Sequence, residues 1–307
     1  MEKRKEEKIK TKIITKNICC LTWNMHGQTP SNEDINKLLK NHKEKNYDIY
    51  VIGSQECLRS IFKSLFYSDK SIWENQLKIF FGNEYEMLLS VTLAAINMII
   101  FIKKNLKEEI KDINYNTIKT GAKNLLGNKG AVGIWFNFYN INIMFINSHL
   151  AANKKFSEKR NDNLEYIMQN MNPHYLNLDF IVFMGDLNYR LNNALININD
   201  IKINYLKYLE FDQLTFERKK IKSVLGFKEG KIKFLPTFKY KNNTDEFEYD
   251  NINKQPAWTD RILYIKRETS FNVFDVEQKE YNSMQNVLMS DHKPVYSYFD
   301  IKMIIGI

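Results

Sequence analysis

Short apolar runs of strand length recur along this chain, and they constrain its fold more than any other feature of the sequence. Several of them are apolar at every position, a pattern typical of strands that are covered on both faces. We therefore expect sheets that lie between other layers of structure. The runs, which are rich in Ile, Val and Phe, are Ile18–Trp23, Ile49–Ile52, Met98–Ile102, Ala131–Phe138, Ile141–Asn147, Phe180–Met184, Arg261–Ile265 and Val295–Phe299.

Segments with helical character lie between these runs. Asn32–Lys45 follows Ser31, a residue type that favours the N-cap position, and Asp34 comes three residues after the cap. Two successive runs, Ala131–Phe138 and Ile141–Asn147, are separated by only two residues, which requires an antiparallel hairpin. The alternation of strands and helices, together with this hairpin, predicts an α/β domain with mixed sheets.

The domain organisation follows from length and from the lack of a linker. The chain has 307 residues, of which 11 are Gly and 5 are Pro. Its length allows one large domain or two smaller ones, but no Gly/Ser/Pro-rich stretch and no internal repeat divides it. We expect a charged N-terminal tail at residues 1–16 and a single domain at residues 17–307.

Targeting signals are not evident in the sequence. The three cysteines, Cys19, Cys20 and Cys57, do not have the number or spacing of a disulfide framework, so we expect reduced thiols. Residues 1–12 are charged throughout and contain no apolar segment typical of a signal peptide. The longest apolar stretch, Val91–Ile102, is shorter than the roughly 20 residues of a membrane span. We expect a soluble cytoplasmic protein.

The chain is basic. Lys and Arg total 45 and Asp and Glu total 36, which leaves a formal net charge of +9. Such an excess favours an anionic partner, which is nucleic acid, a membrane surface or a phosphorylated small molecule. Charge alone does not choose among these partners, and it is equally typical of a soluble Lys-rich surface.

Polar residues stand at one end of six apolar runs. Taken singly, each group is typical of an ordinary turn, but six strand ends of this kind predict one site if they converge. Carboxylate and carboxamide oxygens suit Mg²⁺, and the chain lacks the Cys or His spacing of a zinc site. With histidines beside them, they suit hydrolysis of a phosphate ester. The residues are Asn24, Glu56, His149, Asp186, Asn188, Asp260, Asp291 and His292.

Eight short motifs, in a fixed order, make the sequence similar to a known family. From about Asn17 to about Ile301 the chain resembles the catalytic domain of inositol polyphosphate 5-phosphatases. The resemblance implies the DNase I-like fold of the endonuclease/exonuclease/phosphatase superfamily. This fold is a four-layer α/β sandwich, with two mixed, mostly antiparallel sheets packed face to face and helices outside. The motifs are LTWN (21–24), IGSQE (52–56), GNKG (127–130), NSHLAA (147–152), GDLNYR (185–190), PTFKY (236–240), PAWTDRIL (256–263) and SDHKPV (290–295).

The resemblance also implies roles for the polar residues at the strand ends. Asp186 and Asn188 match the pair that positions the attacking water and the scissile phosphate, and Asp260 matches the carboxylate that orients His292. The resemblance does not decide which group takes the proton from water. We expect Asp186, because a histidine held by Asp260 should be cationic and a poor base. The implied catalytic residues are His149, Asp186, Asn188, Asp260 and His292, and the implied Mg²⁺ ligands are Asn24, Glu56 and Asp291.

Basic and polar residues in the same motifs match contacts to a phosphorylated inositol ring. Lys acts on phosphate as a point charge, whereas Arg acts as a bidentate fork. Two departures bear on the 4-phosphate, because Phe238 stands where many members have Tyr and Lys254 stands where Arg is expected. The substrate-binding residues implied by the resemblance are Asn128, Lys129, Tyr189, Arg190, Lys239, Lys254 and Arg261.

Two apolar segments match parts of the family that touch lipid. Their side chains would enter the membrane interface beside basic residues, and ordinary core packing is the alternative. The expected membrane contacts are Leu65, Phe66, Tyr67, Leu93 and Ile96.

Residues and resemblance together predict a Mg²⁺-dependent phosphomonoesterase. It would remove the 5-phosphate from phosphatidylinositol 4,5-bisphosphate, related phosphoinositides or soluble inositol polyphosphates. We expect a cytoplasmic monomer in peripheral contact with anionic membrane, and no nucleic acid partner. Two alternatives stay open: a DNA-processing nuclease of the same superfamily, and an inactive phosphoinositide-binding module. The GNKG, NYR and PTFK segments argue against the nuclease, which has no need to hold ring phosphates.

Overall fold

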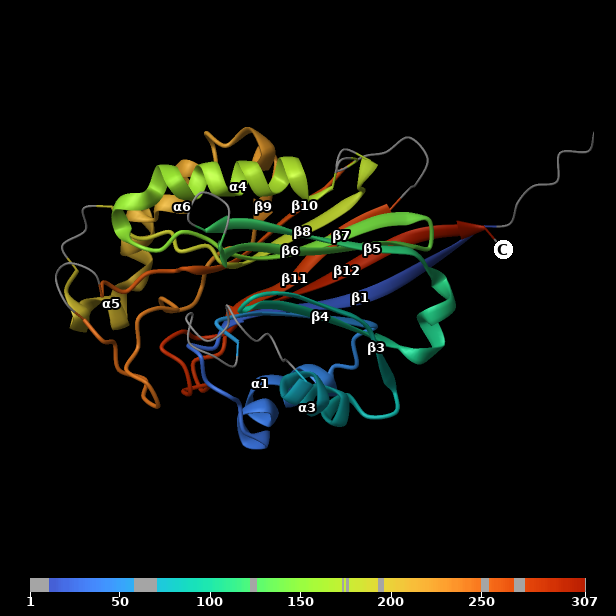
Figure 1. Ribbon diagram of the computed structural model, residues 1–307, viewed down its shortest axis with the longest axis horizontal. Coiled ribbons are helices and arrows are strands. Elements are labelled where there is room, and N and C mark those ends of the chain that lie inside the picture. Colours follow the sequence, from blue (N-terminus) through green and yellow to red (C-terminus); the bar gives the residue numbers. More distant parts are fainter. Residues whose placement is uncertain are drawn as a thin grey trace, which may run out of the picture.

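Two β-sheets face each other at the centre of the molecule, and helices cover their outer faces (Figure 1). Helices α1 (Asn32–Glu44) and α3 (Ser71–Phe81) lie against one sheet, and α4 (Ser157–Met171) and α6 (Gln213–Glu217) lie on the side of the other. The expected four-layer α/β sandwich is confirmed. The computed structural model describes residues 11–57, 71–121, 126–172, 174, 177–192, 196–249, 254–267 and 274–306.

The first sheet has six strands in the order β11-β12-β1-β2-β4-β3. Strands β1 and β2 run parallel, and the other neighbouring pairs run antiparallel. The tail expected at residues 1–16 is wrong at its C-terminal end, because β1 begins at Thr11 and pairs with β12 from that residue. The strands are β1 (Thr11–Asn24), β2 (Ile49–Gln55), β3 (Tyr85–Leu93), β4 (Ile96–Lys103), β11 (Phe274–Ser283) and β12 (Val295–Gly306).

The second sheet also has six strands, in the order β5-β6-β7-β8-β10-β9. Strands β6 and β7 form the predicted antiparallel hairpin, with Phe138 paired to Ile141. Strands β7 and β8 run parallel, so both end at the same edge of the sheet. The strands are β5 (Ile110–Gly121), β6 (Leu126–Phe138), β7 (Ile141–His149), β8 (Phe180–Asp186), β9 (Lys228–Glu229) and β10 (Asp260–Lys266).

The central strands β2 and β8 are buried at every position because both of their faces are covered. Val51 of β2 and Val182 of β8 belong to the main core, which includes residues from both sheets. Neighbouring residues point the other way, toward the helices, as the alternation of a strand requires. Tyr50 packs against Phe81 of α3, with ring centroids 4.9 Å apart, and Phe183 packs in a cluster with Ile167 of α4.

The remaining helices are short. The predicted N-cap of α1 is confirmed, because the Ser31 side chain accepts from the backbone of Asp34 in a capping box. Among the described residues, none of the helices has both the length and the apolar character that a bilayer crossing requires. The other helices are α5 (Ile198–Asn204) and the 3-10 helices η1 (Lys104–Glu109), η3 (Lys154–Phe156), η5 (Tyr205–Phe211) and η6 (Lys222–Val224).

Candidate active site

Strand register brings polar residues from both sheets to one edge of the sandwich. In the second sheet, His149 of β7 lies opposite Asp186 of β8, and Asp186 lies opposite Asp260 of β10. In the first sheet, Asn24 ends β1 beside the end of β2, which Glu56 follows directly. The ends of these five strands therefore meet, although their residues are far apart in the sequence.

Asp186 lies at the centre of this cluster and is 1% exposed. Its Oδ2 accepts a hydrogen bond from Asn24 Nδ2 (3.0 Å), and its Oδ1 accepts one from the backbone N–H of Asn188 (3.0 Å). His149 Nε2 lies 3.3 Å from Asp186 Oδ2. Burial alone would raise the pKa of Asp186, but His292 and His149 hold it well below its ordinary value. Asp186 is thus an ionised carboxylate beside buried imidazoles.

His292 and Asp260 form a buried pair next to Asp186. His292 Nδ1 lies 2.9 Å from Asp260 Oδ2, and His292 Nε2 lies 3.9 Å from Asp186 Oδ2. Burial alone would lower the pKa of His292, but Asp260 and Asp186 raise it to about 9. The imidazole is therefore cationic at neutral pH, with Nε2 available as a donor on the side of Asp186.

Two threonine hydroxyls hold the Asp260 carboxylate in place. Thr237 Oγ1 and Thr259 Oγ1 donate to Asp260 Oδ2, at 2.7 and 2.9 Å. The reasoning from sequence did not identify them, although both stand inside the quoted PTFKY and PAWTDRIL motifs. Their hydroxyls mattered only once the fold brought residues 237, 259 and 260 together.

The turn before β12 is fastened to the end of β1. Ser290 Oγ donates to the backbone carbonyl of Asn24 (2.6 Å) and accepts from the backbone N–H of His292 (3.1 Å). Trp23 Nε1 donates to the carbonyl of His292 (3.2 Å). These bonds place His292 from one sheet opposite Asp186 from the other.

Glu56 and Asp291 supply oxygen atoms at the outer side of the cluster. Among the described residues, the Glu56 carboxylate makes only long contacts, to Asn24 Nδ2 at 3.5 Å, His149 Nε2 at 3.8 Å and His26 Nδ1 at 4.0 Å. Burial alone would raise the pKa of Glu56, but His149 and Lys129 hold it below its ordinary value. Asp291 lies 3.2 Å from His26 Nδ1. An ionised carboxylate with loosely held oxygens, beside further carboxylates and an amide, fits a hard divalent cation such as Mg²⁺.

A second possible arrangement of metal ligands is also present. The nearest ligand atoms of Asp186, Asp260 and His292 all lie within 4.8 Å of one another. The side chain of His292 is already bonded to Asp260, however, and its raised pKa opposes binding to a metal. Glu56 is therefore the better ligand for a cation at this edge.

Lys129 and Asn128 reach the site from β6. Lys129 Nζ contacts His149 Nε2, and burial lowers the pKa of Lys129 to about 8 while Asp186 and Glu56 act in the opposite direction. Burial and the charge of Lys129 lower the pKa of His149. The side-chain oxygen of Asn128 is buried and has no hydrogen-bond partner among the described residues. Lys129 therefore borders the polar cluster, and Asn128 directly precedes it in β6.

Arg190 lies over an aromatic ring at the mouth of the site. Its Nη2 donates to Asn188 Oδ1 (2.6 Å), and its guanidinium lies 4.1 Å from the centre of the Phe238 ring. The Phe238 ring also packs against the imidazole of His292, with ring centroids 4.6 Å apart. Within the described part of the chain, Nε and Nη1 of Arg190 are buried without hydrogen-bond partners. They are donors suited to an anionic ligand.

The two lysines near the mouth share one carboxylate. Lys239 Nζ lies 3.3 Å from Glu248 Oε2 and 3.5 Å from Asp291 Oδ2, and Lys254 Nζ pairs with Glu248 Oε1. Reasoning from sequence did not identify Glu248, although it stands between the two lysines in the chain. The lysines lower its pKa, so Glu248 is a fixed negative charge between them.

Arg261 and Tyr189 do not face the site, and their predicted contact with substrate is wrong for this structure. Both are 0% exposed. Arg261 is paired with Asp212 (2.9 Å) and Glu229 (2.6 Å), and the Tyr189 hydroxyl donates to Asn161 (2.7 Å). Successive strand residues point to opposite faces, so Asp260 at the site requires Arg261 to point away from it.

The membrane contacts expected at Leu93 and Ile96 also need correction. Leu93 is 7% exposed and Ile96 is 0% exposed, and both belong to the main core. They pair with each other at the end of the β3–β4 hairpin. The alternative of core packing holds for these two residues. Leu65, Phe66 and Tyr67 lie outside the described residues.

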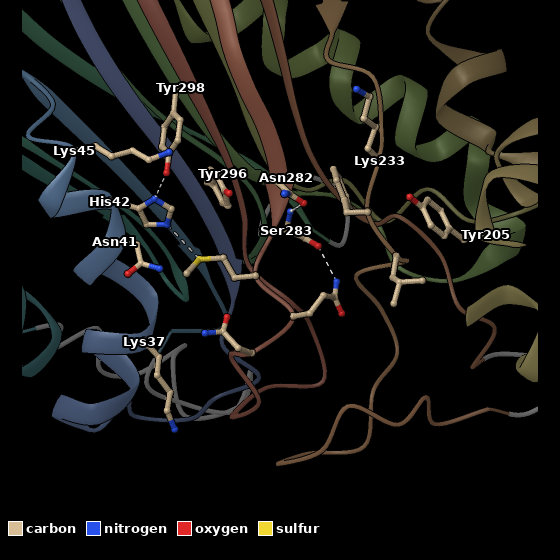
Figure 2. Close-up of a pocket in the computed structure, with 15 residues that line it drawn as sticks. Lys37, Asn41, His42, Lys45, Tyr205, Lys233, Asn282, Ser283, Tyr296 and Tyr298 are labelled. Atoms are coloured by element: carbon tan, nitrogen blue, oxygen red, sulfur yellow. Dashed lines mark hydrogen bonds between the residues drawn. The ribbon is translucent and has the colours of Figure 1, made fainter. Parts of the chain in front are cut away.

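A cavity of about 650 Å³ lies apart from the polar cluster, between α1 and the β11–β12 end of the first sheet (Figure 2). The buried His42 of α1 contacts the Tyr298 hydroxyl in its wall, and Lys45 lies 4.2 Å from the centre of the Tyr298 ring. Two of its lysines, Lys37 and Lys45, are already paired with glutamates. This cavity is separate from the residues described above.

Comparison with known proteins gives concordant matches. Residues 21–298 match the model of Endonuclease/Exonuclease/phosphatase family 2. The chain is 30% identical, over 304 residues, to the phosphatidylinositol polyphosphate 5-phosphatase type IV of Rattus norvegicus, covering 92% of this chain and 45% of that protein. It is also 30% identical to the type IV inositol polyphosphate 5-phosphatase 11 of Arabidopsis thaliana, covering 92% of this chain and 82% of that protein.

A solved structure matches the fold as well. It is the inositol polyphosphate 5-phosphatase domain of SpSynaptojanin, in complex with inositol (1,4)-bisphosphate and a calcium ion. The two chains superpose with a TM-score of 0.83 and 27% identity, over 96% of this chain and 87% of that one.

Proposed function

Because the chain belongs to the endonuclease/exonuclease/phosphatase family and, within it, to the inositol polyphosphate 5-phosphatases, we propose that it hydrolyses the 5-phosphate of phosphoinositides or soluble inositol polyphosphates. The observation that carries the proposal is the buried trio of an ionised Asp186, a cationic His292 and its partner Asp260, meeting at one edge of both sheets. This trio is suited to activate water beside a phosphate ester.

Glu56, Asn24 and Asp291 would hold the metal ion, which we propose to be Mg²⁺. Their oxygens fit that ion, and the calcium ion in the related SpSynaptojanin structure supports a divalent cation in this family. When bound, the ion neutralises negative charge on the phosphate oxygens.

Different residues of this chain activate the water, position the phosphate and stabilise its charge. Asp186 accepts a hydrogen bond from the attacking water and takes its proton as the new oxygen–phosphorus bond forms. Asn188, held against the carbonyl of Leu150 (3.1 Å), fixes the end of β8 beside the phosphate. His292 donates from Nε2 to a phosphate oxygen, and His149 contacts the same group from β7. The bond between phosphorus and the ring oxygen breaks, the leaving oxygen takes a proton from solvent, and Asp186 returns the proton it took to solvent.

Recognition of the ring would fall to the basic residues at the mouth. The unpartnered donors of Arg190 and the ammonium groups of Lys129, Lys239 and Lys254 are placed to bind further phosphates, with Asn128 beside them. Glu248 competes with phosphate for Lys239 and Lys254, so binding of a phosphate there must draw the lysines from this carboxylate.

We propose further that the protein acts as a cytoplasmic monomer at the surface of anionic membrane. All residues of the site come from one chain, which supports catalysis by a single copy. The net charge of +9 and the phosphoinositide names of the relatives support peripheral contact with lipid. The chain spans 45% of the length of the rat relative, so nothing about that protein's other segments carries over.

One assay tests the proposed reaction. Purified protein is incubated with Mg²⁺ or with EDTA, and with inositol 1,4,5-trisphosphate, vesicles containing phosphatidylinositol 4,5-bisphosphate, or DNA with an abasic site. We expect Mg²⁺-dependent phosphate release from the inositol compounds and none with EDTA. Asp186→Asn should lower kcat by about 10³-fold with the fold retained in circular dichroism. Cleavage of DNA alone would establish the nuclease instead, and lipid binding without any turnover would establish the inactive binding module.

A further inference from the structure

A buried arginine behind the site has no carboxylate partner in the part of the chain that the structure describes. Arg160 of α4 is 0% exposed, and burial lowers its pKa to about 10, so it is still cationic at neutral pH. Buried cations are costly and normally pair with an acid. Among the described residues, Arg160 makes no ion pair. It donates instead to backbone carbonyls, from Nη1 to Ala151 (3.1 Å) and to Asn153 (2.6 Å).

The other end of the guanidinium reaches Gln213, the first residue of α6. Arg160 Nη2 donates to Gln213 Oε1 (2.6 Å), and the same oxygen accepts from the backbone N–H of Arg190 (2.9 Å). The backbone N–H of Gln213 returns a bond to the carbonyl of Arg190 (2.9 Å). Gln213 is 3% exposed and is therefore a buried bridge between Arg160 and the segment that follows β8.

These bonds join the two segments that leave the catalytic strands. Ala151 and Asn153 follow His149 at the end of β7, and Arg190 follows Asp186 and Asn188 at the end of β8. The segment continues toward the site, because Arg190 Nη2 donates to Asn188 Oδ1 (2.6 Å). The bridge thus ties the end of one catalytic strand to the end of the next.

The dipeptide Asp212-Gln213 extends this network to a third strand. Asp212, directly before Gln213, accepts from Arg261 Nη1 at 2.9 Å, and Arg261 directly follows Asp260 in β10. Arg261 has two acidic partners, Asp212 and Glu229, whereas the described hydrogen-bond partners of Arg160 are neutral carbonyl oxygens. The two ion pairs of Arg261 are sufficient to explain why it is buried. The burial of Arg160 requires another reason.

We propose that Arg160 and Gln213 are positioning residues, which set the spacing between the ends of β7 and β8 so that His149 and Asn188 stay aligned with Asp186. Neither side chain touches the reacting groups. Charge-assisted bonds to carbonyls fix the two segments more firmly than neutral bonds do. The proposal rests on the proposed function, since it concerns the alignment of groups for that reaction.

The test removes the bridge between α6 and Arg160 of α4, and compares it with a hydrogen bond to the far end of α4. Gln213→Ala removes the acceptor shared by Arg160 and Arg190. Gln213→Glu keeps this oxygen and loses only the bonds that Nε2 donates to Asn192 Oδ1 (3.0 Å) and the Lys154 carbonyl (3.4 Å). Asn116→Ala is the control, because Asn116 Nδ2 donates to the carbonyl of Met171 (3.0 Å) at the other end of α4. The kcat and KM for inositol 1,4,5-trisphosphate are measured with Mg²⁺, and amide hydrogen exchange is followed in residues 149–153 and 186–192.

We expect Gln213→Ala to lower kcat by about 10²-fold, the size of loss that small misplacements cause, with little change in KM. Its exchange should rise in both segments, Gln213→Glu should recover most of kcat, and Asn116→Ala should resemble the wild type. If Gln213→Ala does not fold, Arg160→Lys gives the same comparison, because an ammonium group cannot reach both the segment after β7 and Gln213.

Two results would overturn the positioning role. One is an unchanged kcat per folded molecule together with lower thermal stability, and the other is a Gln213→Glu variant as slow as Gln213→Ala. An inactive wild type would refute the proposed function instead. In that event the exchange comparison still decides whether Gln213 fixes the two segments, since it needs no turnover.

Discussion

The state of each charge at the site depends on its immediate partners. His292 is cationic because it is buried against Asp260, and Asp186 is ionised because imidazoles lie beside it, although burial opposes both charges. At the mouth, the Glu248 carboxylate offsets the positive charge of Lys239 and Lys254, because it pairs with both. Each of these partners is therefore a separate target for substitution.

The first prediction concerns Asp260. Activity requires protonated His292, so kcat should fall as pH rises through the His292 pKa of about 9. Asp260→Asn removes the carboxylate that raises this pKa, and the fall should then begin at lower pH. We also expect kcat at pH 7 to drop by about 10²-fold or more. The pH dependence of kcat measures both effects.

A milder change provides the control for Asp260. Thr237→Val removes one hydrogen bond to Asp260 and keeps the charge, so its pH profile should shift much less. Equal pH profiles for wild type and Asp260→Asn would show that Asp260 does not control the protonation of His292.

The second prediction concerns Glu248. Glu248→Gln removes the negative charge that competes for Lys239 and Lys254, so phosphate at the mouth should bind more tightly. We expect KM for inositol 1,4,5-trisphosphate to fall by several-fold with kcat nearly unchanged. Glu246→Gln is the matched control, because Glu246 pairs only with the exposed Lys241 among the described residues. A rise in KM for Glu248→Gln would show that Glu248 orients the lysines for substrate rather than competing with it.

At the scale of helices and strands, the helix cap determines where α1 begins, and the alternation of side chains determines which residues of a strand face the site. The Ser31–Asp34 capping box starts α1 where the sequence predicted it. The alternation along β10 sends Asp260 to the site and Arg261 to the opposite face. Helix α1 lies against the first sheet (Figure 1), and its range, Asn32–Glu44, contains none of the residues of the polar cluster.

The third prediction follows from that position of α1. Ser31→Ala should lower the free energy of unfolding by about 1 kcal/mol, because the backbone N–H of Asp34 in the first turn of α1 loses its acceptor. Ser31→Asn retains a capping oxygen and should stay close to the wild type. Urea unfolding at pH 7 measures the difference. Turnover per folded molecule should not change, and a loss of turnover would mean that α1 influences the site.

At the scale of the whole molecule, stability depends on the polar groups that are buried between α1 and the first sheet. His42 of α1 is 3% exposed and contacts the Tyr298 hydroxyl of β12, and the two lie in the wall of the separate cavity (Figure 2). Burial lowers the pKa of His42 to about 4. The fold therefore requires His42 to be neutral.

The fourth prediction is a pH dependence of stability. Between pH 6.5, the ordinary pKa of histidine, and the folded-state pKa of about 4, the unfolded chain binds a proton at His42 that the folded chain does not. The contribution of neutral His42 is complete above pH 6.5 and is lost as pH falls toward 4, amounting to about 3 kcal/mol. His42→Gln should remove this part of the slope in urea unfolding between pH 7 and 5. An equal slope in the variant would refute the assignment.

The sequence by itself determined an α/β domain with buried strands and the members of the polar cluster, and its resemblance to a family implied the sandwich. Runs that are apolar at every position can be stable only between two covering layers, so Phe180–Met184 predicted a buried strand without any knowledge of its neighbours. The polar residues that end these runs, such as Asn24 and Asp186, predicted one site because neighbouring strands end at a common edge.

Only the tertiary structure decided which side chains face that site. Arg261 and Tyr189 stand in the same motifs as Asp260 and Asp186, yet they point into the fold and pair with residues from other elements. Leu93 and Ile96, which the sequence predicted at the membrane, likewise point into the core. An apolar or charged side chain has the same chemistry whether it faces core, ligand or solvent. Its direction depends on strand register and on partners distant in the sequence, which a local pattern does not contain.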